Sequence, residues 1–256
     1  MADSITEFTS WTLVEDPPSP NMSAIVNNPS QITLTANALV LNATDIGYQS
    51  VDGQTAATST SGFAFDPASD FSLAADYDFS FLGLTIGGLV VGFGIGEDSD
   101  GMNSAGAIVA TTHSAGLLTT AATGAARTND INHPLQVLSA PAPLTGSFFA
   151  SYEALSGDIT VGTGAPGAVL PTTSTTFSNI QQGWTGANLF PSLFLRSEHP
   201  FGSGWNAGTG VAVFGNPRVL SGTPISVVIP EPATLTLAIL GCLGMHIRTR
   251  RRRPPQ

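Results

Sequence analysis

The 256-residue sequence predicts an all-β protein, a two-sheet antiparallel sandwich followed by one C-terminal membrane-anchoring helix. Three observations predict this. The composition suits strands and turns, with 28 glycines, 18 prolines and only 10% charged residues. Residues 71–81 alternate apolar and polar side chains with period two, which is typical of a half-buried strand. Beyond Pro232, an uncharged stretch runs into an arginine cluster. We therefore expect an exported sandwich domain at residues 1–226 and a tail at residues 227–256.

The expected strands are short and are separated by turns rich in glycine, proline, asparagine and serine. Two hairpins are expected, one around Glu97 to Gly101 and one around Ser156 and Gly157. Residues 112–143 predict a long surface loop or a short edge strand, and the TTSTT run at 172–176 predicts a polar loop. We expect strands at residues 11–14, 32–41, 46–51, 71–81, 84–95, 106–111, 148–155, 158–161, 189–196 and 210–220.

Charge is distributed unevenly along the chain. Lysine is absent, and three arginines and seventeen acidic residues precede Pro230, so the body carries a formal charge of −14. Such a charge argues against nucleic-acid binding and suits a secreted protein, or one that gathers divalent cations. The single cysteine, Cys242, lies in the apolar tail segment, so the body forms no disulfide of its own.

The later strands contain short patterns that point to a particular kind of sandwich. They resemble the concanavalin-like jelly rolls of legume-lectin and laminin-G type. The resemblance covers a minor part of the chain and implies a jelly-roll-like fold. Its residues are Gly146, Phe148 and Tyr152, the run Leu193-Phe194-Leu195, and Phe214, Asn216 and Val219.

The tail has three parts in a fixed order. Pro230, Glu231 and Pro232 come first, then fifteen uncharged residues at 233–247, then five arginines within 248–253. A helix of that length spans roughly 22 Å, which is short for a bilayer but adequate for an anchor with snorkelling arginines. Arginine beside an apolar segment stays on the cytoplasmic side, so we expect the body on the opposite side of the membrane.

This tail resembles the PEP-CTERM sorting signal of exported bacterial proteins. The resemblance implies recognition by an exosortase-type transpeptidase, inner-membrane anchoring, and then a place at the cell surface or outside the cell. Met1 to Phe8 show no signal peptide, so we expect either a start of translation further upstream or another export route. The matching residues are Pro230, Glu231, Pro232, Arg248, Arg250, Arg251, Arg252 and Arg253.

One acidic turn is a candidate metal site. Asp98, Asp100 and Asn103 lie within seven residues around Gly101, and their oxygen atoms are ligands of the kind that Ca²⁺ prefers. The alternative is a solvated hairpin turn, because Asp, Asn and Gly are also good turn formers. Calcium is the one cofactor that the sequence suggests.

A glycine-rich loop carries the candidate ligand-binding residues Trp205 and Asn206. Aromatic faces on loops at the rim of a sandwich can stack on sugar rings, with asparagine supplying hydrogen bonds. In the alternative interpretation, Trp205 fills the core.

Catalytic motifs are weak. Asp76 and Asp78 lie on one face of a strand about 7 Å apart, opposite Tyr77 and Phe79, which favours a solvated outer face over a catalytic pair. The repeated glycines at 92–96 lack a following helix, so they predict close packing and no nucleotide site. Ser147 and Ser192 lack a nucleophile elbow. The four histidines, expected as lone surface residues, are His113, His133, His199 and His246.

The sequence therefore favours an exported, non-catalytic binding or structural domain at the cell surface that contacts extracellular polysaccharide. The alternative is a secreted polysaccharide hydrolase on the same fold. The expected partners are the sorting enzyme, the membrane and a polysaccharide.

Overall fold

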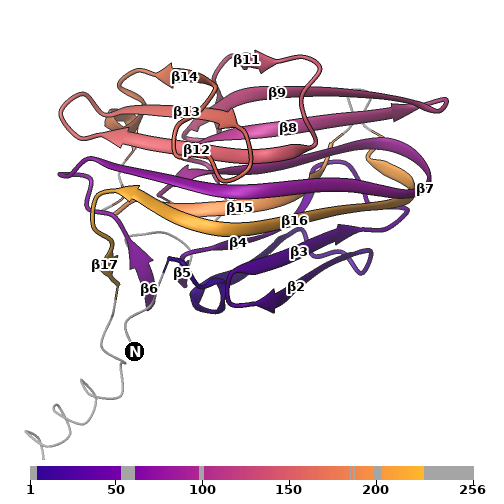
Figure 1. The fold of residues 1–256 in the computed structure, drawn as a ribbon, viewed down its shortest axis with the longest axis horizontal. Coiled ribbons are helices and arrows are strands. Elements are labelled where there is room, and N and C mark those ends of the chain that lie inside the picture. Colours follow the sequence, from indigo (N-terminus) through magenta and orange to yellow (C-terminus); the bar gives the residue numbers. More distant parts are fainter. Residues whose placement is uncertain are drawn as a thin grey trace, which may run out of the picture.

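The computed structural model describes residues 5–52, 61–97, 101–184, 186, 188–198 and 203–227. Within these ranges the regular structure consists of strands, apart from two short 3-10 helices, η1 (Phe8–Ser10) and η2 (Ile180–Gly183). Most of the long strands run along the long axis of the molecule (Figure 1). The structure confirms the all-β antiparallel sandwich, and the predicted C-terminal helix lies outside the described residues.

One layer, here called the back sheet, contains the strands that carry most of the large core aromatics. Adjacent strands within this sheet are antiparallel throughout. In spatial order, the back sheet consists of β2 (Met22–Asn28), β3 (Gln31–Ala36), β16 (Trp205–Ser221), the first part of β7 (Phe71–Gly96), β12 (Thr145–Glu153), β13 (Asp158–Gly164) and β14 (Thr173–Phe177).

The second layer, here called the groove sheet, lies against the back sheet. A small third sheet is made by β17 (Ile225–Ser226), β6 (Ser61–Ala64) and β5 (Val51–Asp52). The groove sheet consists of β1 (Thr12–Asp16), β4 (Thr44–Gln49), β15 (Phe190–Ser197), the second part of β7, β8 (Ser104–Ser114) and β9 (Leu117–Thr128), with β10 (Ile131–Asn132) and β11 (Gln136–Ser139) paired to β9.

The 26-residue strand β7 belongs to both layers. Its first part pairs with β12 and β16, and its second part, residues 87–96, pairs with β15 and β8. Gly83 and Gly87 have φ values of +80° and +119°, which glycine adopts without strain, so the chain can turn between the layers there. Figure 1 shows this turn at the right-hand end of the molecule.

The core fills the space between the layers. β12 and β13 contact β8 and β9, and β3 and β2 contact β15 and β4. Its members include two stacked ring pairs with centroids 4.2 Å apart, Tyr77 with Phe148 and Phe65 with Phe71. Burying a side chain of this size contributes about 1.5–3 kcal/mol, so the apolar layer stabilises the fold without a disulfide.

The structure corrects the predictions for two segments. The segment 112–143, expected as a long loop or a short edge strand, contains the twelve-residue strand β9, with the short strands β10 and β11 paired to it. The TTSTT run forms the edge strand β14. The residues of β9 that face the core are small because the opposite sheet fills the space. A Cβ on Gly124 would lie 2.5 Å from Thr175 Cγ2. Such a strand lacks the large apolar side chains on which the prediction depended.

Candidate functional site

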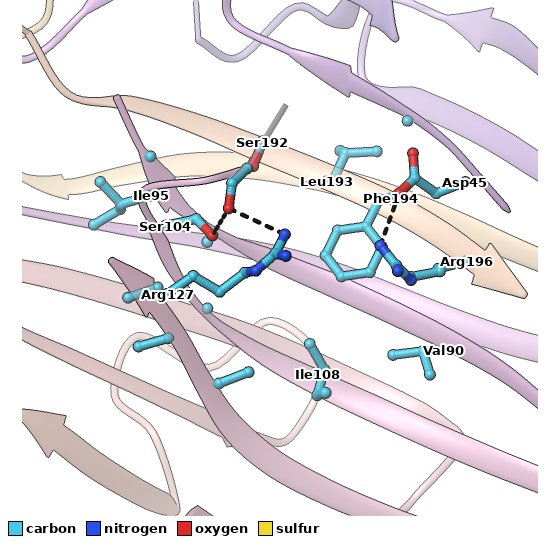
Figure 2. Close-up of a pocket in the computed structure, with 18 of the residues that line it drawn as sticks. Asp45, Val90, Ile95, Ser104, Ile108, Arg127, Ser192, Leu193, Phe194 and Arg196 are labelled. Atoms are coloured by element: carbon cyan, nitrogen blue, oxygen red, sulfur yellow. Dashed lines mark hydrogen bonds and ion pairs between the residues drawn. The ribbon is translucent and has the colours of Figure 1, made fainter. Parts of the chain in front are cut away.

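A groove of about 460 Å³ lies on the outer face of the groove sheet. Its walls come from β1, β4, β15, β7, β8 and β9, and from the segment around His133. This volume falls within the range of ligand-binding pockets in proteins. Figure 2 shows the lining side chains projecting from strands that are far apart in the sequence.

The strand register arranges the outward residues of the groove in four rows that cross the sheet. Successive rows are two residues apart along β7, so the first and fourth rows are separated by about 20 Å along the strand. In order, the rows contain Asp16, Asp45, Arg196 and Val90; then Val14, Gly47, Phe194, Gly92 and Ile108; then Gln49, Ser192, Gly94, Gly106 and Ala125; and finally Gly96, Ser104 and Arg127.

Glycines in the middle rows leave room for the ring of Phe194. A Cβ on Gly92 would lie 2.6 Å from ring atoms of Phe194, so no other residue fits beside this side chain in its present position. Phe194 itself is half-buried. In Figure 2 its ring lies between the Asp45–Arg196 pair and Arg127. The predicted role of the repeated glycines, close approach of neighbouring groups, is confirmed.

The first row forms a charged end of the groove. Arg196 Nη1 lies 3.3 Å from Asp45 Oδ2, and its Nε lies 3.0 Å from Glu198 Oε2. Burial raises the pKa of Asp45 to about 6; Arg196 opposes this shift and Asp16 adds to it. Asp16 is the direct cross-strand partner of Asp45, which places their Cβ atoms about 5 Å apart. Three carboxyl groups and one guanidinium therefore meet at this end.

The opposite end of the groove is built around Arg127. Its guanidinium donates to the Gly101 carbonyl oxygen at 3.5 Å and forms an ion pair with Asp130. The Ser104 hydroxyl donates to the same carbonyl oxygen at 3.0 Å. Nearby, Nε2 of His133 is hydrogen-bonded to the Thr128 hydroxyl at 3.0 Å. The donors and acceptors at this end suit hydroxyl groups of a ligand.

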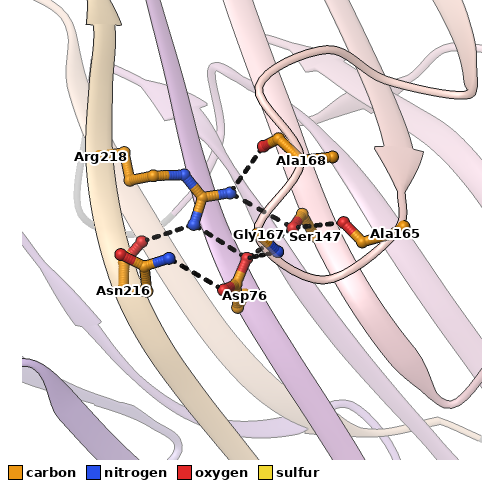
Figure 3. Close-up of polar contacts among 7 residues, drawn as sticks. All are labelled: Asp76, Ser147, Ala165, Gly167, Ala168, Asn216 and Arg218. Carbon is orange, nitrogen blue, oxygen red and sulfur yellow. Dashed lines mark hydrogen bonds and ion pairs between the residues drawn. The ribbon is translucent and has the colours of Figure 1, made fainter.

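Asp76, one of the two aspartates considered for catalysis, has a structural role on the back sheet. Its Oδ1 accepts from Arg218 Nη1 at 2.9 Å and from the Gly167 amide at 3.1 Å, and its Oδ2 accepts from Asn216 Nδ2 at 3.0 Å. The Ser147 hydroxyl also donates to it. Figure 3 shows this network joining β7, β12 and β16.

The two aspartates at 76 and 78 thus have different surroundings. Burial alone would raise the pKa of Asp76, but hydrogen bonds from Ser147, Asn216, Arg218 and Gly167 lower it overall. Asp78 is exposed, as the sequence predicted. Asp76 departs from the expected solvated position because Arg218, from a distant part of the chain, covers it.

The candidate calcium turn lies partly outside the described residues. Asp98 and Asp100 belong to that part. Asn103 is buried; its Nδ2 donates to Glu97 Oε1 at 2.7 Å, and its Oδ1 accepts from the Asn129 amide at 2.7 Å. Among the described residues, no cluster of three or more metal-ligating side chains occurs. The side chain of Asn103 thus stabilises the turn, and calcium binding stays a prediction.

Trp205 does not lie on the surface. It is 0% exposed, packs edge-on against His113 with ring centroids 5.2 Å apart, and donates from Nε1 to the Gly208 carbonyl oxygen. Its ring faces are therefore closed to a sugar, which corrects its assignment to ligand binding and agrees with the core alternative. Asn206 is exposed, and its contact with a ligand stays a prediction.

The histidines differ from the expectation of lone surface residues. His113 is buried among aromatic rings, bonds to Thr85 Oγ1 through Nδ1 at 2.6 Å, and has its pKa lowered by burial. His133 lines the groove. His199 and His246 lie outside the described residues. The prediction is therefore wrong for His113, because the turn of β7 and the start of β16 cover it.

The sorting tail also lies outside the described residues, from Val228 onward. That part of the chain contains Pro230, Glu231, Pro232 and the arginines at 248–253. Within the described ranges, no helix has the length and apolar character needed to cross a bilayer.

Sequence reasoning missed Phe194 and Arg196 as site residues. Within the run 189–196 they alternate with Leu193 and Leu195, so the period-two pattern already placed them on the face opposite the core. The pattern could not show that this face is hollowed, because the glycines that make the hollow come from three other strands.

No family model matches the chain, and no curated protein matches its sequence. Solved structures with a similar arrangement of strands include an alginate lyase from Klebsiella pneumoniae, at 10% identity over 75% of this chain and 82% of that chain, with a TM-score of 0.48. An alginate lyase from Pseudomonas aeruginosa is similar at 12% identity, over 84% and 98%, with a TM-score of 0.46. A legume lectin-like domain from Entamoeba histolytica has 9% identity, over 86% and 97%, and a TM-score of 0.41.

Proposed function

We propose that this chain is an exported cell-surface or extracellular-matrix protein whose sandwich domain binds a polysaccharide in the groove without cleaving it. The observation that carries the proposal is the open groove across six neighbouring strands, with glycines in its floor and the half-buried ring of Phe194 at its centre. A polymer can contact such a groove along its whole length, whereas a compact ligand would fill only part of it.

The chemistry of the groove suits sugars. The apolar face of a sugar ring packs on an aromatic side chain, and its hydroxyl groups donate to carboxylates and accept from guanidinium or amide groups. Phe194 supplies the ring, while Asp45, Arg196 and Ser192 from the same face supply the polar groups. Both kinds of contact lie within three adjacent rows, close enough for one short stretch of glycan to use them together.

The groove is tested by two substitutions that act on it in different ways. Phe194→Ala removes the stacking ring, and Ala125→Phe adds bulk to the third row without entering the core. We expect each to weaken retention on gels that contain the producing cell's own extracellular polysaccharide by roughly tenfold, which corresponds to about 1.4 kcal/mol. Leu155→Ala, at a residue that is 94% exposed on the β12–β13 hairpin, is the control and should bind normally. Normal binding by both groove variants would overturn the proposed site.

The location of the protein is proposed from its tail. Pro230, Glu231 and Pro232, the apolar stretch and the arginines support anchoring in the inner membrane, recognition by an exosortase-type enzyme, and transfer to the surface. Replacing Pro230 and Glu231 with alanine should leave the full-length mass in the membrane fraction. Mass spectrometry of the membrane and soluble fractions measures this. If the variant is processed in the same way as the wild type, the sorting proposal is contradicted.

A hydrolase is the second candidate, and it now depends on different residues. Asp16 and Asp45 are directly opposed in the groove, and burial raises the pKa of Asp45 to about 6, which suits a general acid. An enzyme would release reducing ends from a bound glycan, and Asp45→Asn would abolish that release. A binding protein would release none, so prolonged incubation followed by chromatography of the products separates the two candidates.

A further inference from the structure

Resting on the proposed polysaccharide site, we infer that the groove accepts neutral glycans and rejects acidic ones such as polyuronates. Whether an acidic glycan can bind depends on which side chains of this body are cationic and on the groups that already pair with them.

Cations are few in the body, and the protein's own acids hold them. Without lysine, the only basic side chains that carry a fixed charge before Pro230 are Arg127, Arg196 and Arg218. Each forms an ion pair: Arg127 with Asp130, Arg196 with Asp45 and Glu198, and Arg218 with Asp76. A sugar carboxylate entering the groove therefore meets no arginine that lacks a carboxylate partner.

Acids exceed bases in the first row and at its edge. Asp16, Asp45 and Glu198 line that end of the groove with Arg196 as their single cation. The body as a whole carries a formal charge of −14. A polyuronate would bring carboxylates against these carboxylates, and like charges placed together in an interface oppose binding. The penalty increases with each charged sugar unit that enters.

The same groups favour sugars that carry only hydroxyls. A carboxyl group has two acceptor oxygens, so Asp16 and Asp45 can accept hydrogen bonds from hydroxyl groups at adjacent positions of a sugar ring. The guanidinium of Arg196 carries five N–H groups, and its two ion pairs do not use all of them. The remaining N–H groups can donate to a sugar hydroxyl. Neutral hydroxyls thus find both acceptors and donors without disturbing an ion pair.

The test uses glycans that differ only in charge. Polygalacturonate, alginate and hyaluronate are each compared with their carboxyl-reduced forms, alongside a neutral glucan and a neutral galactomannan. The full-length protein in mild detergent is run through gels that contain each polymer, at low and moderate salt and with chelator present. We expect at least one carboxyl-reduced form to bind about tenfold more tightly than its acidic parent, with the difference larger at low salt because charge repulsion is then less screened.

Charge-neutralising variants identify the cause. The double variant Asp16→Asn with Glu198→Gln should narrow the difference between acidic and reduced polymers, while Asp78→Asn, an exposed residue on the back sheet, should leave it unchanged. Equal or tighter binding of an acidic polymer by the wild type would overturn the inference and leave the polysaccharide site standing. Failure to bind any polymer of the panel, together with failure to bind the producing cell's own polysaccharide, would overturn the proposed function itself.

Discussion

Replacing Asp76 with alanine should destabilise the sandwich much more than the same change at Asp78, two residues along the same face of β7. Asp76 accepts hydrogen bonds from Ser147, Gly167, Asn216 and Arg218, and its loss leaves the guanidinium of Arg218 without its carboxylate. Asp78 is exposed. The comparison therefore separates a structural network from a surface charge at nearly the same place.

The magnitude follows from how deeply the pair is buried. Removing one partner of a fully buried ion pair costs about 3–5 kcal/mol, whereas exposed pairs contribute about 0–1 kcal/mol. The side chains of Asp76 and Arg218 are 23% and 16% exposed, so the pair lies between these limits. We expect Asp76→Ala to lower the free energy of unfolding by about 2–3 kcal/mol, and Asp78→Ala to change it by less than about 0.5 kcal/mol.

Urea denaturation of both variants and the wild type measures the difference, and its pH dependence supplies a second check. Because hydrogen bonds lower the pKa of Asp76 in the folded state, its contribution is present above the unfolded value of 3.8 and is lost as pH falls below it. The gap between wild type and Asp76→Ala should therefore shrink from pH 6 to pH 3. Equal effects of the two alanine variants at pH 6 would refute the reasoning.

Three further predictions concern the groove and the core. Burial raises the pKa of Asp45 from 3.8 to about 6 in the folded state, so the stability contributed by its protonated form is full below pH 3.8 and is lost as pH rises through 6. In urea denaturation, the wild type should lose up to about 3 kcal/mol of unfolding free energy across that window relative to Asp45→Asn. Parallel plots of unfolding free energy against pH for the two proteins would argue against burial of the carboxyl. Gly92→Val should displace the Phe194 ring and weaken glycan binding in gels roughly as Phe194→Ala does, with unchanged retention counting against the ring's role. Trp205→Ala should cost about 3–5 kcal/mol in the same denaturation assay while leaving glycan affinity per folded molecule unchanged, and a selective loss of affinity would restore Trp205 to the site.

Much of the fold follows from local patterns in the chain. Alternation at 71–81 identified the first part of β7 and its core face, and the turn residues at Ser156 and Gly157 identified the β12–β13 hairpin. These features depend on neighbours in sequence, which share one strand or one turn. β9 was not predicted because its core-facing residues are small, and their size depends on side chains of the opposite sheet.

The body charge of −14, the absence of lysine and the order of the tail's parts are properties of the sequence alone, and so is the two-faced character of each strand. Only the tertiary structure decided that Trp205 fills the core, that Asp76 is held by Arg218, and that Phe194 faces an open groove. The physical reason is register. A strand's alternation gives two faces, but antiparallel pairing of segments more than a hundred residues apart determines which side chains meet on each of them.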